Sequence, residues 1–368
     1  MLSYTILLII AIVSINILLC FYFLFFWRLS AHKMKDTSFS NPISIIICAK
    51  NEEQSLKENL HKILNQKYFN FEVIVVNDQS IDGTSFLLEE LKKSYSNLVV
   101  VTIDNHVNQK IGKKFALTLG IKTAKYEHLL LTDADCVPNS ENWIKKMVRN
   151  FTYSDIVLGY GGYKREGGLL NKFIRFDTFN VAQQYLSFAL AGQTYMGVGR
   201  NLAYKKSLFF DNKGFATHIH IPSGDDDLFI QEIAPKSTVT IEMSEDTHTT
   251  SEVIQSWIEW TYQKRRHITT ASFYKTKFKI LLTLYPYAQL LFWVSIILLF
   301  AVKSPLEISL SLVGFKLLAS YIVNYTPMKK LNTLDLYWIH PLYEISYLLI
   351  QGIFVLLNLF SKPKKWNR

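Results

Sequence analysis

Short apolar runs alternate with amphipathic segments in the middle of the chain. The runs at residues 42–50 (PISIIICAK), 71–80 (FEVIVVNDQS), 97–104 (NLVVVTID) and 128–135 (HLLLTDAD) are typical of buried strands. The segments between them repeat apolar residues at helical spacing, as Leu56, Leu60 and Ile63 do. Strands that alternate with helices in this way predict a mostly parallel sheet with right-handed crossovers, so the predicted fold class is α/β.

Acidic side chains follow three of these predicted strands. Glu52 follows the first strand, Asp78 ends the second, and Asp133 and Asp135 end the fourth. Ligands of parallel sheets lie beyond the carboxyl ends of the strands, and strand positions i and i+2 face the same side. We therefore expect Asp133 and Asp135 to point at one object, such as Mg²⁺ or Mn²⁺, which prefers oxygen ligands. The alternative is that the two aspartates only cap the turn or helix that follows.

A long apolar segment precedes the predicted sheet. From Met1 to Trp27 there is no charged side chain, which at about 1.5 Å per helical residue is long enough to span a bilayer. A signal peptide is the alternative, but it would require a basic start and a small-residue cleavage site, so we predict a retained anchor at residues 1–28. Arg28, Lys33 and Lys35 follow, and the positive-inside rule places that side of the membrane in the cytoplasm.

Apolar segments return after the predicted α/β domain, which we place at residues 40–255. An amphipathic interfacial segment is predicted at 256–279, a membrane region with two or three spans at 280–361, and a basic tail at 362–368. The number of spans stays open because Lys316 lies near the middle of one segment, where an ionisable group is costly. The chain is therefore predicted to be an integral protein of a bacterial inner membrane with a cytoplasmic catalytic domain.

Charge and cysteine content narrow the possible partners. The formal net charge of +10 is compatible with nucleic-acid binding, but basic clusters beside apolar segments favour anionic lipid headgroups as the explanation. We therefore predict a membrane partner and no nucleic acid. The three cysteines show no paired spacing, which suits a reducing compartment and argues against disulfides or a zinc site.

Seven motifs resemble, in order and spacing, those of the membrane-bound family 2 glycosyltransferases. They are CAKNEE (48–53), VVNDQSIDGT (75–84), GKKFALTLG (112–120), LLLTDAD (129–135), GVGRNLAY (197–204), SGDDDL (223–228) and QKRRH (263–267). The resemblance implies a GT-A type, Rossmann-like domain that binds a nucleotide-sugar donor, with a UDP-sugar favoured. Thr118 stands where the family often has Asn, and His267 stands where it has Trp.

The resemblance also implies roles for individual residues. Asp135 would ligate Mg²⁺ or Mn²⁺ on the donor diphosphate together with Asp133, which also touches the donor. The remaining donor-binding residues would be Glu52 and Asp78 at the nucleoside, Lys113 near the donor, and Gln263 and Arg265 in the QKRRH motif.

Arg266, in the same motif, is predicted to act in catalysis by stabilising the departing diphosphate. The alternative is that these arginines snorkel at the membrane surface beside Trp257. Three histidines, His218, His220 and His248, are left out of the predicted site, although we expect neighbouring acidic residues to raise the pKa of His248.

Three adjacent aspartates, Asp225, Asp226 and Asp227, supply a candidate catalytic base. Because their charges repel one another, one of them is expected to have a raised pKa and to accept a proton near neutral pH. An inverting sugar transfer requires such a base for the acceptor hydroxyl. Asp226 is the first choice by resemblance, a different register selects Asp227, and an exposed acidic turn after Gly224 is the alternative to both.

These features together predict a metal-dependent inverting glycosyltransferase with a lipid or lipid-linked acceptor. A processive polysaccharide synthase is the nearest alternative, but His267 in place of Trp and the few predicted spans argue against it. A nucleotidyltransferase would show a glycine-rich basic loop where this chain has NEE. A catalytically silent scaffold would not require acidic clusters at separate strand ends.

Overall fold

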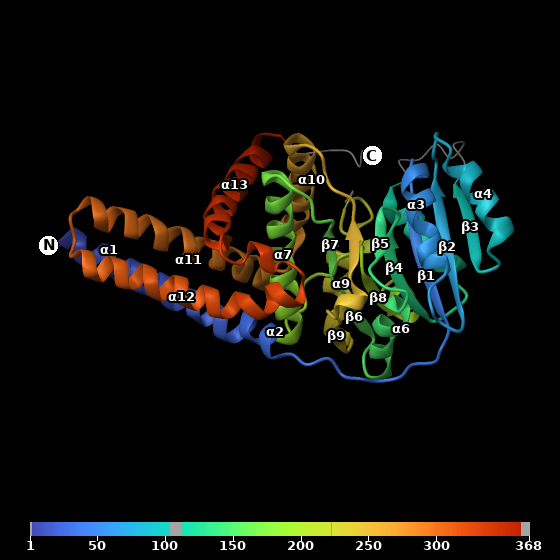
Figure 1. The fold of residues 1–368 in the computed structure, drawn as a ribbon, viewed down its shortest axis with the longest axis horizontal. Helices are drawn as coiled ribbons and strands as arrows, with labels where there is room; N and C mark the ends of the chain where they lie inside the picture. Colours follow the sequence, from blue (N-terminus) through green and yellow to red (C-terminus); the bar gives the residue numbers. More distant parts are fainter. Residues whose placement is uncertain (1, 104–111, 222, 362–368) are drawn as a thin grey trace.

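The computed structural model describes residues 2–103, 112–221 and 223–361. The predicted basic tail at 362–368 therefore lies outside the described residues. The molecule is elongated, with a bundle of long helices at one end and the α/β region at the other (Figure 1).

A mixed seven-stranded sheet with the order β3-β2-β1-β4-β8-β6-β9 forms the centre of the α/β region. The four predicted strands are confirmed as β1 (Ile43–Ala49), β2 (Phe71–Asp78), β3 (Leu98–Ile103) and β4 (His128–Asp133). They pair in parallel, with Ile43 opposite both Phe71 and His128. The helices between them are α3 (Glu53–Leu64), α4 (Thr84–Ser94) and α5 (Lys113–Thr123), so this half of the sheet follows the predicted alternation.

The other half of the sheet is mixed and was not predicted. It contains β6 (Ile156–Leu158), β8 (Leu202–Lys205) and β9 (Val239–Ile241), where β8 runs antiparallel to both β4 and β6. A three-stranded sheet of β5 (Cys136–Pro138), β10 (Thr249–Ser251) and β7 (Gly161–Tyr163) lies beside it. The remaining short helices are α6 (Trp143–Val148), α8 (Lys206–Asp211) and α9 (Asp227–Ile233), with single 3-10 turns at η2 (Arg149–Thr152), η3 (Ala216–His218), η4 (Ala234–Lys236) and η5 (Glu245–Thr247).

Alternate residues of the central strands face two different cores. Ile43, Ile45 and Ile47 pack with α3 and α6, whereas Ile46 packs on the opposite face with α5. This second core continues without interruption into the helical end of the molecule, where it includes Phe21. The α/β region and the long helices therefore share one hydrophobic core.

Two helices connect the sheets to the bundle: α7 (Leu169–Leu190) and α10 (Trp257–Thr270). Among the described residues, four helical segments are long and apolar enough to cross a membrane. They are the N-terminal segment Tyr4–Ala31, built from α1 (Leu2–Phe21), a π-helical turn η1 (Tyr22–Phe26) and α2 (Trp27–Ala31), followed by α11 (Thr276–Ala301), α12 (Leu306–Lys330) and α13 (His340–Phe360). The 3-10 turns η6 (Ala271–Phe273) and η7 (Leu334–Leu336) precede α11 and α13.

A buried ion pair compensates the charge of Lys316, the residue that left the number of predicted spans open. The Lys316 side chain in α12 is 1% exposed and pairs with Glu344 of α13, which also accepts a hydrogen bond from Gln289 of α11. Lys316 Nζ also lies 5.1 Å from the centre of the Trp293 ring. Three helices thus meet around one neutralised charge, and α12 qualifies as a candidate span.

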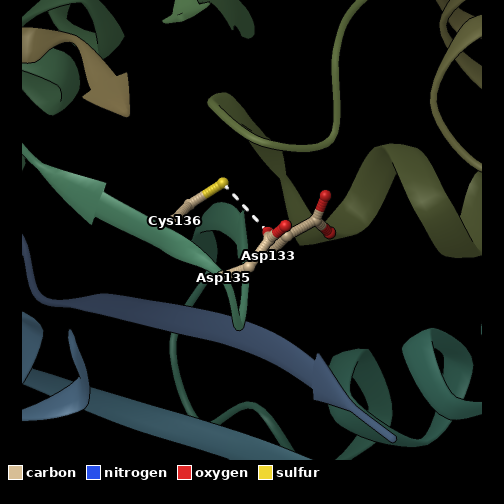
Figure 2. A group of neighbouring side chains, drawn as sticks. All are labelled: Asp133, Asp135 and Cys136. Carbon is tan, nitrogen blue, oxygen red and sulfur yellow. Dashed lines mark hydrogen bonds between the residues drawn. The ribbon is translucent and has the colours of Figure 1, made fainter. Parts of the chain in front are cut away.

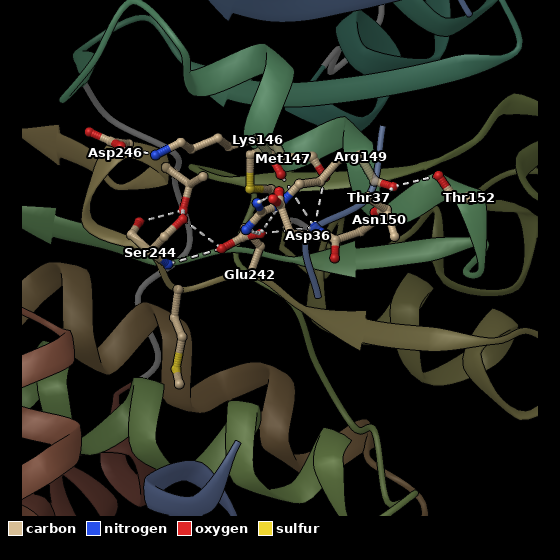
Figure 3. A network of polar contacts seen from close by, with 12 residues as sticks. Asp36, Thr37, Lys146, Met147, Arg149, Asn150, Thr152, Glu242, Ser244 and Asp246 are labelled. Atoms are coloured by element: carbon tan, nitrogen blue, oxygen red, sulfur yellow. Dashed lines mark hydrogen bonds and ion pairs between the residues drawn. The ribbon is translucent and has the colours of Figure 1, made fainter. Parts of the chain in front are cut away.

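The segment between α2 and β1, residues 32–42, runs along the α/β region to reach the sheet (Figure 1). A polar cluster around the fully buried Glu242 holds this segment, and we call it the Glu242 cluster (Figure 3). Arg149 Nη2 lies 3.0 Å from Glu242 Oε2 and its Nη1 lies 3.4 Å from Asp36 Oδ1. Thr37 Oγ1 donates to the Arg149 carbonyl at 2.9 Å, so the cluster fastens the segment to the domain.

Candidate active site

A cavity of about 390 Å³ lies at the carboxyl ends of β1 and β4. Glu52 after β1, Lys113 at the start of α5, and Asp133 and Asp135 at the end of β4 line this cavity. The acidic run Asp225 to Asp227 lines it as well. The structure therefore brings together, in one cavity, residues that the sequence places at separate strand ends.

Asp133 and Asp135 come together as predicted (Figure 2). However, β4 ends at Asp133 and Asp135 lies in the turn before β5, so the strand alternation expected to align them does not reach Asp135. Each offers an oxygen to a group that also contains Cys136 Sγ, and the ligand atoms all lie within 4.8 Å of one another. Burial and the two neighbouring aspartates raise the pKa of the Cys136 thiol well above its usual value, so it stays protonated and is a poor metal ligand. Two carboxylates remain, and this donor set fits a hard cation such as Mg²⁺ or Mn²⁺.

Lys113 connects the two acidic groups of the cavity. Its Nζ lies 2.7 Å from Asp133 Oδ1 and 3.3 Å from Asp225 Oδ2. Burial alone would lower the pKa of Lys113, but the charges of Asp133 and Asp225 outweigh burial and raise it well above its usual value. Lys113 is therefore a permanent cation between the end of β4 and the acidic run.

The loop before α9 presents the acidic run. Gly224 has a φ of +100°, and a Cβ at this position would come within 2.6 Å of Leu228 Cδ1, so the turn requires glycine. Asp226 caps α9: its Oδ1 accepts from the Asp227 N–H at 2.8 Å and its Oδ2 from the Gly199 N–H at 2.9 Å. Burial, followed by the charges of Asp225 and Asp227, raises the pKa of Asp226 to about 7.

Asp227 is held in a different way from Asp226. Its Oδ2 accepts hydrogen bonds from Thr270 Oγ1 at 2.6 Å and from the Tyr274 hydroxyl at 2.7 Å, and its Oδ1 accepts from the Leu228 N–H. Oδ2 therefore fastens α9 to the end of α10 and to Tyr274, while Oδ1 caps α9 itself. Burial raises the pKa of Asp227 as well as that of Asp226. The two carboxylates differ in their partners, because side-chain hydroxyls occupy Asp227 whereas backbone N–H groups hold Asp226.

The QKRRH segment lies on α10, where successive side chains point in different directions. Gln263, Arg266 and His267 line the cavity, and Arg266 Nη1 lies 3.3 Å from Ser223 Oγ, next to the acidic run. Burial, followed by the charge of Arg266, lowers the pKa of His267 well below its usual value, so it is neutral. Arg265 does not line the cavity: its Nε donates to Asn358 Oδ1 of α13 at 2.9 Å. The structure therefore corrects the prediction that Arg265 contacts the donor, because it faces away.

Asp78 lies farther out along the sheet. It ends β2, which is two strands from β4, so its carboxylate is separated from Asp133 by roughly 10 Å at the usual strand spacing. Asp78 is 1% exposed, and burial raises the pKa of its carboxyl group. It does not line the cavity, and its role at the nucleoside stays a prediction.

The histidines left out of the predicted site, His218, His220 and His248, are not among the described residues that line the cavity. His248 is buried, and burial lowers its pKa to about 4, so the expected increase was wrong. The backbone N–H of His248 donates to the Glu245 carbonyl oxygen. The ring Nε2 of His248 lies 3.2 Å from the Met243 carbonyl oxygen. Desolvation thus outweighs the neighbouring carboxylates.

Residues 44–211 match the family described as glycosyl transferase family 2. These residues form a family 2 glycosyltransferase domain. The matched range contains Lys113, Asp133 and Asp135 but ends before the acidic run and α10.

Curated relatives of this glycosyltransferase domain match only part of their own length. An uncharacterized glycosyltransferase of Haemophilus influenzae is 34% identical over 121 residues, 33% of this chain and 36% of that protein. A 4,4'-diaponeurosporenoate glycosyltransferase of Staphylococcus haemolyticus is 34% identical over 125 residues, 34% of this chain and 32% of that protein. A poly-beta-1,6-N-acetyl-D-glucosamine synthase of Staphylococcus epidermidis is 37% identical over 95 residues, 26% of this chain and 22% of that protein. The chain thus spans about a third or less of the length of most of these relatives.

A solved structure resembles nearly the whole chain. The mannosyltransferase PcManGT from Pyrobaculum calidifontis, determined in complex with GDP-Man and Mn²⁺, aligns over 92% of this chain and 99% of its own. The TM-score is 0.59 and the identity is 19%, which shows a shared fold. The predicted GT-A fold is therefore confirmed, and a coverage this large takes in most of the candidate spans.

Several cavity residues of the glycosyltransferase domain were missed from the sequence. Arg200 lies in the quoted GVGRNLAY motif, lines the cavity and stacks 4.7 Å from the centre of the Tyr163 ring, so the motif itself was a signal. Asp177 and Trp260 line the cavity from α7 and α10. Nothing in the local sequence marks Asp177, because its role depends on how α7 packs against α10.

Proposed function

We propose that this protein is a metal-dependent inverting glycosyltransferase of a bacterial inner membrane, with its catalytic domain in the cytoplasm. It moves a sugar from a nucleotide-sugar donor, for which we propose a UDP-sugar, to a lipid or lipid-linked acceptor. The observation that carries this proposal is the charge of the cavity, where seven acidic residues and four lysines or arginines form the described lining. A cavity with this excess of carboxylates is suited to a divalent cation and its diphosphate.

Asp135 and Asp133 would hold Mg²⁺ or Mn²⁺ at the end of β4. The metal, when bound, supplies positive charge that neutralises the diphosphate. Lys113 is already between Asp133 and Asp225, and Arg266 adds a second cation from α10, where it can meet the leaving diphosphate. Glu52 at the cavity and Asp78 farther along the sheet are proposed to contact the nucleoside, and Gln263 to contact the donor.

Asp226 is proposed as the general base. The acceptor hydroxyl attacks the anomeric carbon, the bond between that carbon and the diphosphate oxygen breaks, and the hydroxyl proton passes to Asp226. The products are the glycoside with inverted configuration and the nucleoside diphosphate. The raised pKa of Asp226 supports this assignment, and its two backbone hydrogen bonds hold the carboxylate in place.

Thermal stability tests the donor site directly. Detergent-purified protein is heated with UDP, GDP, ADP or CDP, each with and without Mn²⁺, beside Asp135→Asn and the surface control Glu141→Gln. We expect one nucleotide, UDP by our proposal, to raise the Tm only with Mn²⁺, in the wild type and in Glu141→Gln but not in Asp135→Asn. Absence of stabilisation by every nucleotide would overturn the donor site.

Product length then separates single transfer from polymer synthesis. Once the donor is known, transfer to membrane lipids is followed by mass spectrometry of the lipid extract. We expect a mass increase of one sugar, because the described chain has only four candidate spans to surround a polymer. A ladder of products would instead favour a processive synthase.

A further inference from the structure

One half of the cavity is built by helices and has no part in the donor chemistry proposed above. We call it the helical pocket and define it by Asp177 of α7, Trp260 and Lys264 of α10, and Tyr347 and Gln351 of α13. α13 is a candidate membrane span, whereas α7 and α10 connect the bundle to the sheets. The helical pocket is therefore the part of the cavity that faces the bundle.

Two buried groups in the helical pocket have unused hydrogen-bonding capacity. Within the described part of the chain, Trp260 Nε1 donates no hydrogen bond, and the Asp177 carboxylate, which pairs with Lys264 and takes the Tyr347 hydroxyl, has lone pairs left over. Both residues are only 1% exposed. Because an unsatisfied buried polar atom is costly, such atoms lining a cavity indicate a missing partner.

Asp177 of α7 and Trp260 of α10 lie on neighbouring helices that touch at two points one turn apart. Lys264 Nζ is 2.5 Å from Asp177 Oδ2, and four residues earlier on each helix the rings of Phe173 and Trp260 are 5.3 Å apart. The Tyr347 hydroxyl faces the same carboxylate from α13. Asp177 and Trp260 thus line the same part of the cavity, where a group that both donates and accepts would satisfy an acceptor and a donor.

The charges of the helical pocket argue against an anionic ligand there. Lys264 is neutralised by Asp177, and Arg265 turns away toward Asn358. Arg266 lies beside Ser223 at the acidic run. A phosphate in the helical pocket would meet the Asp177 carboxylate without a spare cation, whereas a hydroxyl would donate to it.

We propose that the helical pocket binds a neutral polyhydroxyl headgroup, such as the sugar of a glycolipid. One hydroxyl donates to Asp177 and another accepts from Trp260 Nε1, while the amide of Gln351 offers both functions from α13. The assignment of this headgroup to the acceptor rests on the proposed function. The binding of a headgroup in the helical pocket does not depend on that function.

Binding of short alkyl compounds to the full chain tests this pocket. The protein is placed in phosphatidylcholine nanodiscs, and hexyl β-D-glucoside, hexyl β-D-galactoside and hexyl phosphate are titrated by calorimetry. The variants are Asp177→Asn, Trp260→Phe and the matched control Trp257→Phe, whose indole is 41% exposed on the same helix. Stabilisation by nucleotide and Mn²⁺ is measured on every sample.

We expect a glycoside to bind and hexyl phosphate not to bind. Trp260→Phe should weaken glycoside binding about fivefold because it removes the N–H, and Asp177→Asn should weaken it about tenfold or more. Trp257→Phe should bind as the wild type does. Trp260→Phe keeps an aromatic side chain and should lower the Tm only by the cost of the smaller ring, so a loss of folding in Asp177→Asn does not leave the question open.

Two results would overturn the inference. One is preferential binding of hexyl phosphate. The other is that neither glycoside binds the wild type, or that Trp260→Phe binds a glycoside as tightly as the wild type does. Glycoside binding that depends on Trp260 in protein that no nucleotide stabilises would support the helical pocket and reject the donor site. The two proposals therefore fail separately.

Discussion

The Glu242 cluster and the cavity carboxylates are both buried polar groups of the same α/β region, but they balance their charges differently. Glu242 Oε2 accepts from Arg149 and Asn150, and its Oε1 accepts from the Ser244 N–H and hydroxyl. In the cavity, Asp133 and Asp225 share Lys113, and the described lining holds seven acidic residues against four lysines or arginines. The first group is complete within the chain, whereas the second lacks positive charge.

This difference separates a structural ion pair from a ligand site. A satisfied buried pair fixes two segments and has no capacity left for a ligand. A group with surplus carboxylates costs folding free energy until a cation or proton neutralises it. The charge balance of a buried cluster is therefore a better guide to function than its size.

The largest expected effect comes from removing one charge of the unbalanced group. Asp226→Asn should lower the rate of sugar transfer about 10²–10⁴-fold, because the acceptor hydroxyl loses its base. The Tm of the ligand-free protein should not fall, since the substitution relieves repulsion. Release of nucleoside diphosphate from the donor found above measures the rate, with Glu141→Gln as control. Activity within tenfold of wild type would place the base elsewhere, and Asp225→Asn would be examined next.

Breaking the balanced group should instead cost stability. Arg149→Met leaves Glu242 buried without its cation and should lower the free energy of unfolding by about 3–5 kcal/mol. Denaturant titration of the solubilised protein measures the loss. A second substitution, Glu242→Gln, should recover part of it, because no unpaired charge then stays buried. A loss below about 1 kcal/mol would mean that water or another group reaches Glu242.

The pH dependence should report the surplus charge of the cavity. Because the folded pKa of Asp226 is raised to about 7, the folded chain binds an extra proton between the ordinary aspartate range and that value. Its contribution to stability is therefore present at acid pH and is lost as pH rises through about 7, while the transfer rate rises over the same interval. Tm and rate are measured from pH 5 to 8.5. Asp226→Asn should abolish this component of the Tm profile, and an unchanged profile would contradict the assignment.

The smallest effect is expected at an exposed ion pair. Lys67 and Glu141 pair on the surface with side chains 65% and 57% exposed. Lys67→Gln should change the free energy of unfolding by less than about 1 kcal/mol, because water already screens both charges. The same denaturant titration compares it with Arg149→Met. Equal losses in the two variants would remove burial as the explanation.

The sequence predicted the half of the fold in which local pattern and tertiary role agree. β1, β2 and β4 are apolar runs buried on both faces, so their pattern marks them clearly, and the acidic residues at their ends follow from the parallel topology. The short strands β6, β8 and β9 are three or four residues long and carry too little pattern to be recognised. Their existence depends on pairing with distant segments.

The candidate site shows the same division. Arg265 and Arg266 are neighbours in a helix, so they point about 100° apart, and only the packing of α10 decides which one meets the cavity. Asp177 acquires its role from a helix that the sequence analysis did not identify. Asp133 and Asp135, by contrast, come together through the turn that directly follows β4, so their nearness in the sequence was enough to predict a shared site although the strand period was not the reason.

The pair between Lys316 and Glu344 also affects how the bundle is made. The ribosome completes α12 before α13, so Lys316 emerges before its partner exists. A lone lysine in the centre of a span costs about 2.5–3.5 kcal/mol to insert, which is enough to make insertion of a helix of moderate hydropathy unfavourable or nearly so. Synthesis of α13 removes that penalty. We therefore expect α12 to be held firmly in a bilayer only after α13 has been made, and a chain that ends before α13 to leave Lys316 without the partner that neutralises it.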